Sequence, residues 1–271
     1  MDYTIKGNDI IIKQPDFELS QTLDCGQAFR WEEQADGSFK GAFLNTPLHI
    51  STLDIKDGTF ILHDTTEDEL LNIWYDYFDF GTDYDEIKQA LSEDETLKKA
   101  CDFAYGIRIL RQDSWEALSS FIISQNNNIP RIKGIIGRLV EHYGGYPSIN
   151  DMADETAESL GFLRAGFRAK YLVDAVGKLK RKELTIDGIK QAPLDEAMAK
   201  LMKIKGVGPK VASCALLFGF YKTDAFPVDV WVKRVMSEFY PNGLPECTKG
   251  IEGIAQQYLF HYIRKLHGKV E

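Results

Sequence analysis

The sequence predicts an α+β protein, in which an antiparallel β-sheet precedes an all-helical region. Short β-branched and aromatic runs separated by glycine-containing turns fill roughly the first sixty residues, as is typical of paired strands. From about residue 66 onward, apolar residues recur instead with the period of a helix. We expect a sheet domain with some helices over residues 1–93 and a helical region over residues 94–271. A chain of 271 residues is long enough to bury a core in such an arrangement.

Two glycine turns order the expected strands. The turns at Ala35–Ser38 and Lys56–Gly58 each separate segments in which apolar residues alternate with polar ones, which indicates hairpins. We expect one face of the resulting sheet to be covered. The strands are predicted at Tyr3–Ile5, at Ile10–Ile12, around Phe29 and Trp31, around Phe39 and Phe43, around Leu48 and Ile50, and around Phe60 and Leu62.

The expected helices begin at capping residues. Thr66 precedes a helix that places Leu70, Trp74, Tyr77 and Phe78 on one side. Asp113 followed by Glu116 resembles a capping box at the start of another helix. Further helices are predicted over residues 129–143, 152–160, 167–181, 194–204, 209–220, 229–240 and 250–267.

Charge is unevenly distributed along the chain. The net charge is −9, which by itself does not favour a DNA-binding protein. Residues 1–100 carry 22 acidic and 8 basic side chains, whereas residues 101–271 carry 19 acidic and 24 basic ones. If nucleic acid binds, the second part should make most of the contacts. The alternative is that one solvated surface is simply acidic.

No membrane, secretion or metal signal stands out. No apolar stretch of about 18 residues occurs, so no transmembrane helix is expected. The start of the chain lacks the pattern of a signal peptide, so we expect an intracellular protein. The four cysteines fit neither a zinc pattern nor an iron–sulfur cluster, and we expect free thiols.

A hairpin between two apolar helices carries the strongest chemical signal. Gly206 and Gly208 permit a tight turn and a close backbone approach to a ligand, and Pro209 suits the first position of the next helix. The start of that helix presents free N–H groups to an anion such as a DNA phosphate. An ordinary corner between two helices is the structural alternative.

Lys210 and Asp229 are the candidate catalytic residues. Lys210 lies at the second helical position, where the helix dipole disfavours the charged amine and so favours the neutral nucleophile. Cys214 follows four residues later, on the same helix face. Asp229 stands at the start of the helix predicted at 229–240, where it can serve as an N-cap or as a carboxylate that faces a developing positive charge.

These residues resemble a known family. Gly206-Val-Gly-Pro-Lys210 followed by Pro227-Val-Asp229 is similar to the signature of helix-hairpin-helix DNA glycosylases of the endonuclease III superfamily. Asp24-Cys-Gly-Gln-Ala-Phe-Arg-Trp31, Leu110-Arg-Gln-Asp113 and Ser124-Gln-Asn-Asn-Asn-Ile129 all resemble 8-oxoguanine DNA glycosylases. The motifs extend from about residue 20 to residue 260.

The resemblance implies a role for each site residue. Lys210 would attack the sugar and form a Schiff base, while Asp229 would stabilise the positive charge. The damaged base would be flipped out of the duplex. Gly26 would accept a hydrogen bond from N7–H of the base, Cys214 and Phe260 would sandwich it, and Gln256 would bind its polar edge. The cytosine left opposite would be contacted by Asn126, Arg131 and Arg168.

Two positions depart from the family pattern. Phe167 stands where a tyrosine wedge is typical, and Trp231 stands where a histidine contacts phosphate. Without the resemblance, each assignment has a structural alternative. Gly26 could be only a turn residue. Gln256 could lie on the surface and Phe260 on the core side of a terminal helix, and Arg131 and Arg168 could be surface charges.

The function implied is a monomeric glycosylase and AP lyase that excises 8-oxoguanine opposite cytosine from double-stranded DNA. We expect no required cofactor and no side-chain metal site, but a structural monovalent or divalent cation held by backbone carbonyls of the hairpin. Two alternatives remain: a non-catalytic DNA-binding module, and a glycosylase for another damaged base.

Overall fold

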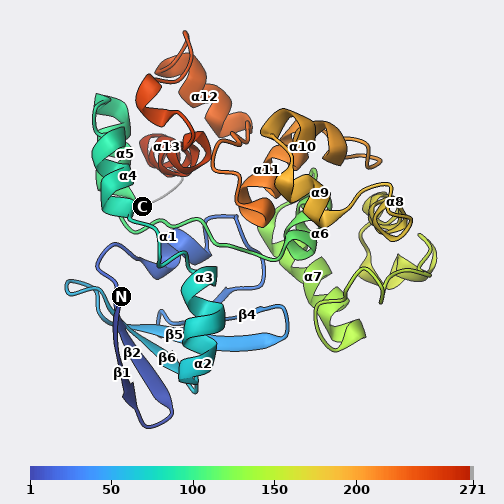
Figure 1. Cartoon of the computed structure of the whole chain (residues 1–271), viewed down its shortest axis with the longest axis horizontal. Coiled ribbons are helices and arrows are strands. Elements are labelled where there is room, and N and C mark those ends of the chain that lie inside the picture. The colour runs from blue at the N-terminus through green and yellow to red at the C-terminus, as the bar shows by residue number, and fades with distance from the viewer. Residues whose placement is uncertain (269–271) are drawn as a thin grey trace.

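The computed structural model describes residues 1–268 and confirms the α+β prediction. One antiparallel sheet comes first, and helices make up most of the remaining chain (Figure 1). The strands follow the order β1-β2-β6-β5-β4-β3 across the sheet. Their bounds are β1 (Asp2–Lys6), β2 (Asp9–Lys13), β3 (Glu32–Glu33), β4 (Phe39–Phe43), β5 (Thr46–Asp54) and β6 (Thr59–His63).

One face of the sheet is buried, as the alternating sequence predicts. Ile10 and Ile12 on β2 point to the same side as Phe60 and Leu62 on β6, and all four are fully buried. Trp74 packs with them from the helical segment α2 (Glu67–Glu69), η1 (Leu70–Trp74) and α3 (Tyr75–Tyr77), which crosses this face (Figure 1). The sheet therefore has a hydrophobic core of its own.

The start of that helical segment confirms Thr66 as a cap. Thr66 and Glu69 form a reciprocal capping box, in which each side chain accepts from the other residue's backbone N–H. The five residues Leu70–Trp74 then form a π-helical turn, which the sequence pattern did not predict.

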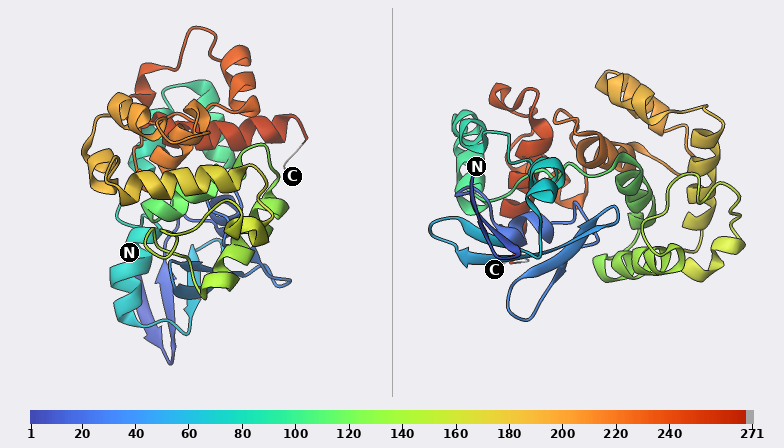
Figure 2. Two further views of the ribbon diagram at one scale, coloured as in Figure 1. Left: turned by 90° about the vertical axis from the view of Figure 1, so that its right-hand side faces the viewer. Right: turned by 60° about the horizontal axis from the view of Figure 1, so that its bottom comes forward.

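The remaining helices build a second, larger core. It includes Tyr84, Leu91, Leu118, Ile135 and Leu216, which are all fully buried. Figure 2 shows from two further sides that the strands stay together while the helices occupy the rest of the molecule. The helices are α1 (Leu19–Leu23), α4 (Tyr84–Leu91), α5 (Glu95–Phe103), α6 (Ser114–Ser124), α7 (Ile129–Tyr143), η2 (Ser159–Leu163), α8 (Arg168–Lys180), α9 (Ile186–Gln191), α10 (Leu194–Leu201), α11 (Pro209–Phe220), α12 (Val230–Glu238), η3 (Glu246–Thr248) and α13 (Glu252–Leu266).

Two expected elements are wrong. The strand expected around Phe29 and Trp31 is reduced to Glu32–Glu33, because Phe29 and Trp31 are buried in different cores and leave no regular ladder. The helix expected over residues 152–160 is replaced by turns followed by the 3₁₀ helix η2, since Thr156 and Ser159 bond each other's backbone N–H groups and compete with an α-helix.

The division at residues 93 and 94 stays a proposal. Helix α4 precedes this point, yet its Tyr84 and Leu91 belong to the core that the later helices form. The last helix, α13, packs against α5, so early and late parts of the chain lie side by side (Figure 1).

Candidate active site

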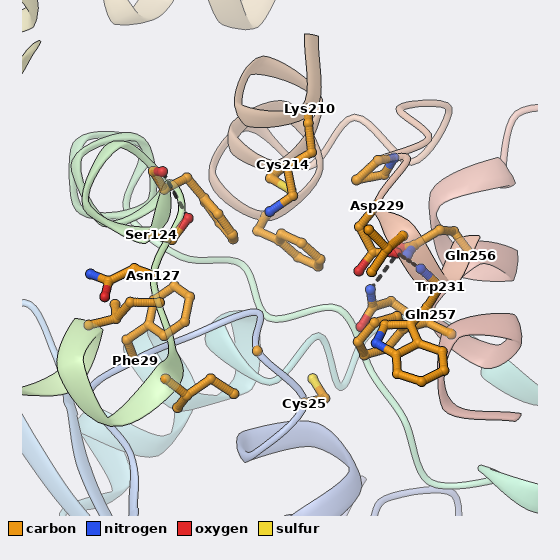
Figure 3. A pocket seen from close by; sticks show the side chains of 18 of the residues that line it. Cys25, Phe29, Ser124, Asn127, Lys210, Cys214, Asp229, Trp231, Gln256 and Gln257 are labelled. Atoms are coloured by element: carbon orange, nitrogen blue, oxygen red, sulfur yellow. Dashed lines mark hydrogen bonds between the residues drawn. The ribbon is translucent and has the colours of Figure 1, made fainter. Parts of the chain in front are cut away.

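A cavity of ≈ 440 Å³ lies between the segment that follows α1 and the helices α6, α7, α11 and α13. Most of the predicted chemistry converges here: Lys210 and Cys214 from α11, Asp229 before α12, and Gln256 from α13 (Figure 3). The full lining consists of Cys25, Gly26, Phe29, Phe121, Ser124, Asn127, Asn128, Ile129, Ile132, Lys210, Cys214, Phe218, Pro227, Asp229, Val230, Trp231, Gln256, Gln257, Phe260 and Arg264.

Helix α11 presents the lysine. It begins at Pro209 as predicted, after Gly208 as the N-cap. Lys210 is exposed, and its Nζ lies 5.8 Å from the centre of the Phe121 ring. An amine that lines the cavity beside an aromatic ring can reach a sugar that enters from solvent.

Cys214 lies one turn further into the same helix and is almost fully buried. Burial raises the pKa of its thiol above the usual value, although the nearby Lys210 opposes this shift. The thiol is therefore neutral at physiological pH, and it offers a base an apolar, polarisable surface.

Asp229 has the structural role that its sequence context predicts. Its Oδ1 accepts hydrogen bonds from the backbone N–H groups of Trp231 (2.9 Å) and Val232 (2.8 Å), so it is the N-cap of α12. The same side chain lines the cavity that Lys210 borders. The two roles are compatible, because one carboxylate oxygen suffices for the cap.

Gly26 lines the cavity from the N-terminal part of the chain. Its backbone has φ = +85°, a left-handed conformation that favours glycine. A Cβ added at this position would meet nothing within 4 Å, since the residue borders open space. Helix α1 and the turn after it carry Gly26 to this place.

Gln256 and Phe260 line the cavity from one face of α13. Gln256 is 4% exposed, and its Oε1 accepts a hydrogen bond of 2.8 Å from Nε2 of the neighbouring Gln257. Sequence reasoning did not identify Gln257. The adjacent amides in the last helix were the signal that could have indicated it.

The residues predicted to contact the opposite cytosine do not line the cavity. Asn126 lies in the loop before α7 and has a left-handed backbone with φ = +46°. Arg131 is exposed in the first turn of α7. Arg168 is buried, and its guanidinium donates to the carbonyls of Gln125, Asn126 (2.9 Å) and Ala165 (3.1 Å).

Phe167 and Arg168 start helix α8 together. The Phe167 ring is 48% exposed and packs edge-on against Tyr171, with 5.6 Å between ring centres. The Arg168 guanidinium lies 4.5 Å from the centre of the same Phe167 ring. An exposed aromatic ring that packs against Tyr171 and Arg168 is compatible with the predicted role of Phe167 as a wedge.

Trp231 and the hairpin glycines complete the predicted set. Trp231 lines the cavity, and the Arg234 guanidinium stacks 4.8 Å from the centre of its ring. Gly206 has φ = +79°, and a Cβ there would collide with the ring of Tyr171. The turn between α10 and α11 therefore requires glycine at residue 206, whereas Gly208 meets no such obstacle.

The described residues contain no cluster of three or more His, Cys, Asp or Glu side chains that could hold a metal ion. The cation predicted at the hairpin would need only backbone carbonyls. The turn at 202–208 is irregular backbone in which Gly206 has a left-handed conformation. Its presence stays a prediction.

Two known protein families match this chain, one in its first part and one in its second part. Residues 9–118 match the family described as "8-oxoguanine DNA glycosylase, N-terminal domain". Residues 119–251 match the family described as "HhH-GPD superfamily base excision DNA repair protein". Together these matches include every residue predicted to act in catalysis or base binding except Gln256 and Phe260.

Individual relatives agree with the family matches. The N-glycosylase/DNA lyase of Saccharomyces cerevisiae is 30% identical over 87% of this chain and 71% of its own length. A probable N-glycosylase/DNA lyase of Methanothermobacter thermautotrophicus is 28% identical over 92% of this chain and 94% of its own length.

A solved structure shares the whole architecture. The 8-oxoguanine glycosylase/lyase of Clostridium acetobutylicum, in complex with double-stranded DNA containing cytosine opposite 8-oxoG, is 38% identical, with a TM-score of 0.88. The alignment covers 98% of this chain and all of that one. The chain therefore belongs to the 8-oxoguanine DNA glycosylase family, within the HhH-GPD superfamily of base excision DNA repair enzymes.

Proposed function

We propose that this protein excises 8-oxoguanine opposite cytosine from duplex DNA and then nicks the strand, with Lys210 as the nucleophile. The convergence of Gly26, Lys210 and Gln256 on one cavity supports this assignment most directly. These three residues come from the turn after α1, from α11 and from α13, and each has a different task in the proposed reaction.

The proposed chemistry begins with the neutral Lys210 amine. Its nitrogen attacks C1′ of the flipped nucleotide while the bond from C1′ to N9 of the base breaks, and the base leaves with the electron pair. The Asp229 carboxylate stabilises the positive charge that develops on the sugar. The two protons that the amine loses go to the departing base and to the ring oxygen O4′, so opening of the sugar ring gives an imine between Lys210 and C1′. Loss of a proton from C2′ then expels the 3′ phosphate, which is β-elimination.

Recognition of the base is assigned to the cavity walls. The backbone carbonyl of Gly26 would accept the N7–H that oxidised guanine has and guanine lacks. Cys214 and Phe260 would cover the two faces of the base, and Gln256 would bind its polar edge. The neutral Cys214 thiol supports this assignment, because a stacking surface requires no charge.

Recognition of the opposite strand is assigned to Asn126, Arg131 and Arg168, next to the Phe167 wedge. The exposed Phe167 ring supports this placement, since an aromatic side chain can fill the gap that a flipped base leaves. Arginine donors suit the acceptors on the exposed edge of an unpaired cytosine.

Borohydride trapping tests the nucleophile. Wild-type protein is expected to be trapped covalently on duplex DNA containing 8-oxoguanine opposite cytosine, whereas Lys210→Gln is expected to bind without being trapped. Lys203→Gln, an exposed lysine of the same hairpin, is the matched control and should trap normally at saturating protein. Equal trapping of Lys210→Gln and wild type would show that the assigned nucleophile is wrong.

Excision rates measured opposite each of the four bases test the substrate assignment. We expect the fastest excision opposite cytosine, and no comparable release of alkylated purines or mismatched thymine in competition. A non-catalytic binding module would release no base at all.

The protein is proposed to act as a monomer inside the cell. No helix among the described residues is long and apolar enough to cross a membrane.

A further inference from the structure

A short segment, residues 106–112, contacts both of the parts that the proposed reaction must bring together. We call it the junction segment. One side of it bonds the turn that carries Gly26, and the other side bonds a buried carboxylate that holds the end of α11. It forms no regular strand or helix, so side-chain hydrogen bonds add to a few backbone ones in fixing its position.

Gln27 attaches the junction segment to the Gly26 turn. Its buried side-chain Nε2 donates to the carbonyl of Arg108 at 2.8 Å, and its Oε1 accepts from the backbone N–H of Leu110 at 2.9 Å. Gln112 of the junction segment also bonds this turn, since its Nε2 donates to the backbone carbonyl of Gln27 at 2.6 Å. Gln27, directly after Gly26, is thus bonded to the junction segment through its side chain and through its backbone carbonyl.

Asp79 attaches the junction segment to the rest of the molecule. This carboxylate is 1% exposed, and its Oδ1 accepts from Nε of Arg111 at 2.7 Å and from the hydroxyl of Thr82 at 2.8 Å. Its Oδ2 accepts from the hydroxyl of Tyr84 at 3.0 Å. A buried carboxylate with so many donors is rigidly held, since each lost partner leaves a desolvated oxygen.

Tyr221 brings helix α11 into the same cluster. It is the C-cap of α11, and its hydroxyl donates to Oδ2 of Asp79 at 2.5 Å. The Arg111 guanidinium lies 3.8 Å from the centre of the Tyr221 ring. Burial and the nearby Asp79 carboxylate raise the pKa of Tyr221 to about 12, so the hydroxyl stays a donor at physiological pH.

We propose that Tyr221 and Gln112 are positioning residues, which set the distance between the base-reading Gly26 and the nucleophile Lys210. The path runs from α11 through Tyr221, Asp79 and Arg111 to the junction segment, and from there through Gln112 and Gln27 to Gly26. This inference rests on the proposed function, because it assigns the path a role in reading the base.

The path matters for one step of the reaction and not for the other. Excision requires that Gly26 hold the base while Lys210 reaches C1′. These two residues must therefore keep a fixed position relative to each other. Cleavage of an abasic site requires Lys210 but has no base for Gly26 to read. Errors of about 1 Å in such alignments can reduce rates by about 100-fold. Loosening the path should therefore slow excision selectively.

The test compares two rates for Tyr221→Phe. The variant keeps the ring that Arg111 covers and loses only the hydroxyl. We expect excision of 8-oxoguanine under single-turnover conditions to fall about tenfold or more. Cleavage of a preformed abasic site opposite cytosine should stay within about twofold of wild type, as expected where no base must be held in register. The ratio of the two rates is the readout, since a loss of folded protein would reduce both equally.

Gln112→Leu provides a second variant at the other end of the path, and it carries the test if Tyr221→Phe does not fold. It should show the same selective loss. Tyr143→Phe is the matched control, because it also removes a tyrosine–carboxylate hydrogen bond, to Glu155 at 2.6 Å, but lies outside the path. Its rate ratio should equal that of wild type.

Two results would overturn the inference: unchanged excision in both folded variants, or an equal loss of excision and abasic-site cleavage. Failure of the proposed function is distinguishable, because the wild-type protein itself would then release no 8-oxoguanine.

Discussion

The guanidinium of Arg168 donates a 2.9 Å hydrogen bond to the backbone carbonyl of Asn126, from a side chain that is only 3% exposed. Asn126 adopts a left-handed backbone at this point, with φ = +46°. The buried arginine thus stabilises the loop that contains Asn126, although its own charge is removed from water. Desolvation accordingly lowers the pKa of Arg168, and the nearby Arg131 lowers it further.

Arg168→Leu is expected to change both stability and specificity. Its loss leaves the buried carbonyl of Ala165 and the partly buried carbonyls of Gln125 and Asn126 without this donor, which costs about 1–3 kcal/mol for each group that water cannot reach. We expect a lower free energy of unfolding in urea and a weaker preference for cytosine opposite the lesion. Arg131→Leu is the matched control: this arginine is exposed, so it should lose preference for cytosine without losing stability. Unchanged stability of Arg168→Leu would contradict the role of its hydrogen bonds.

Gly26→Ala should impair base recognition through the backbone. A left-handed backbone costs alanine about 1–2 kcal/mol of conformational free energy. The turn should therefore shift away from φ = +85°, and the backbone carbonyl of residue 26 should move with it. We expect slower excision of 8-oxoguanine, with abasic-site cleavage retained. Gly7→Ala is the control, since Gly7 has φ = +67° and equal space for a Cβ but lies in the β1–β2 turn. Equal excision by both variants would exclude Gly26 from recognition.

Asp229 allows its capping and electrostatic roles to be separated. Asparagine caps helices about as well as aspartate, so Asp229→Asn should unfold at nearly the same urea concentration as wild type. Because the charge is lost, excision should slow by about 100-fold or more. Asp229→Ala should lose about 1 kcal/mol of stability in addition. If Asp229→Asn excises the base at the wild-type rate, the residue is only a cap.

His261 should make stability depend on pH. Burial lowers its pKa to about 4, and its Nε2 has no hydrogen-bond partner among residues 1–268. In the unfolded chain histidine titrates near 6.5, so between pH 4 and 6.5 the unfolded state binds more protons than the folded one. The free energy of unfolding contributed by His261 therefore falls as the pH drops through this window.

A difference measurement isolates that contribution, because Glu116 acts in the opposite direction. Burial raises the pKa of Glu116 to about 7, so its contribution to stability falls as the pH rises from about 4.5 to 7. Urea unfolding of wild type and His261→Phe should be compared at pH 6.5 and pH 5. Relative to the variant, wild type should lose about 2 kcal/mol over this interval. A constant difference would mean that His261 is not held neutral.

Much of the helical region could be predicted from local sequence. Pro209 and Asp229 begin their helices where the sequence places them, because a proline or a capping carboxylate acts on the next few residues of the same segment. The same locality explains the errors. Phe29 and Trp31 alternate like a strand, but their burial in two different cores overrides the pattern.

The sequence by itself determined the fold class, the hairpin with Lys210, and the residue types that suggest a glycosylase. Tertiary structure alone decided which of these residues share a cavity: it brings Gly26 to Lys210 and Gln256, and it leaves Arg168 buried against Asn126. It also revealed Asp79 and Tyr221, which no motif marks. The physical reason is that caps, turns and periodic faces depend on neighbours in the chain, whereas a cavity and a buried carboxylate depend on segments more than a hundred residues apart.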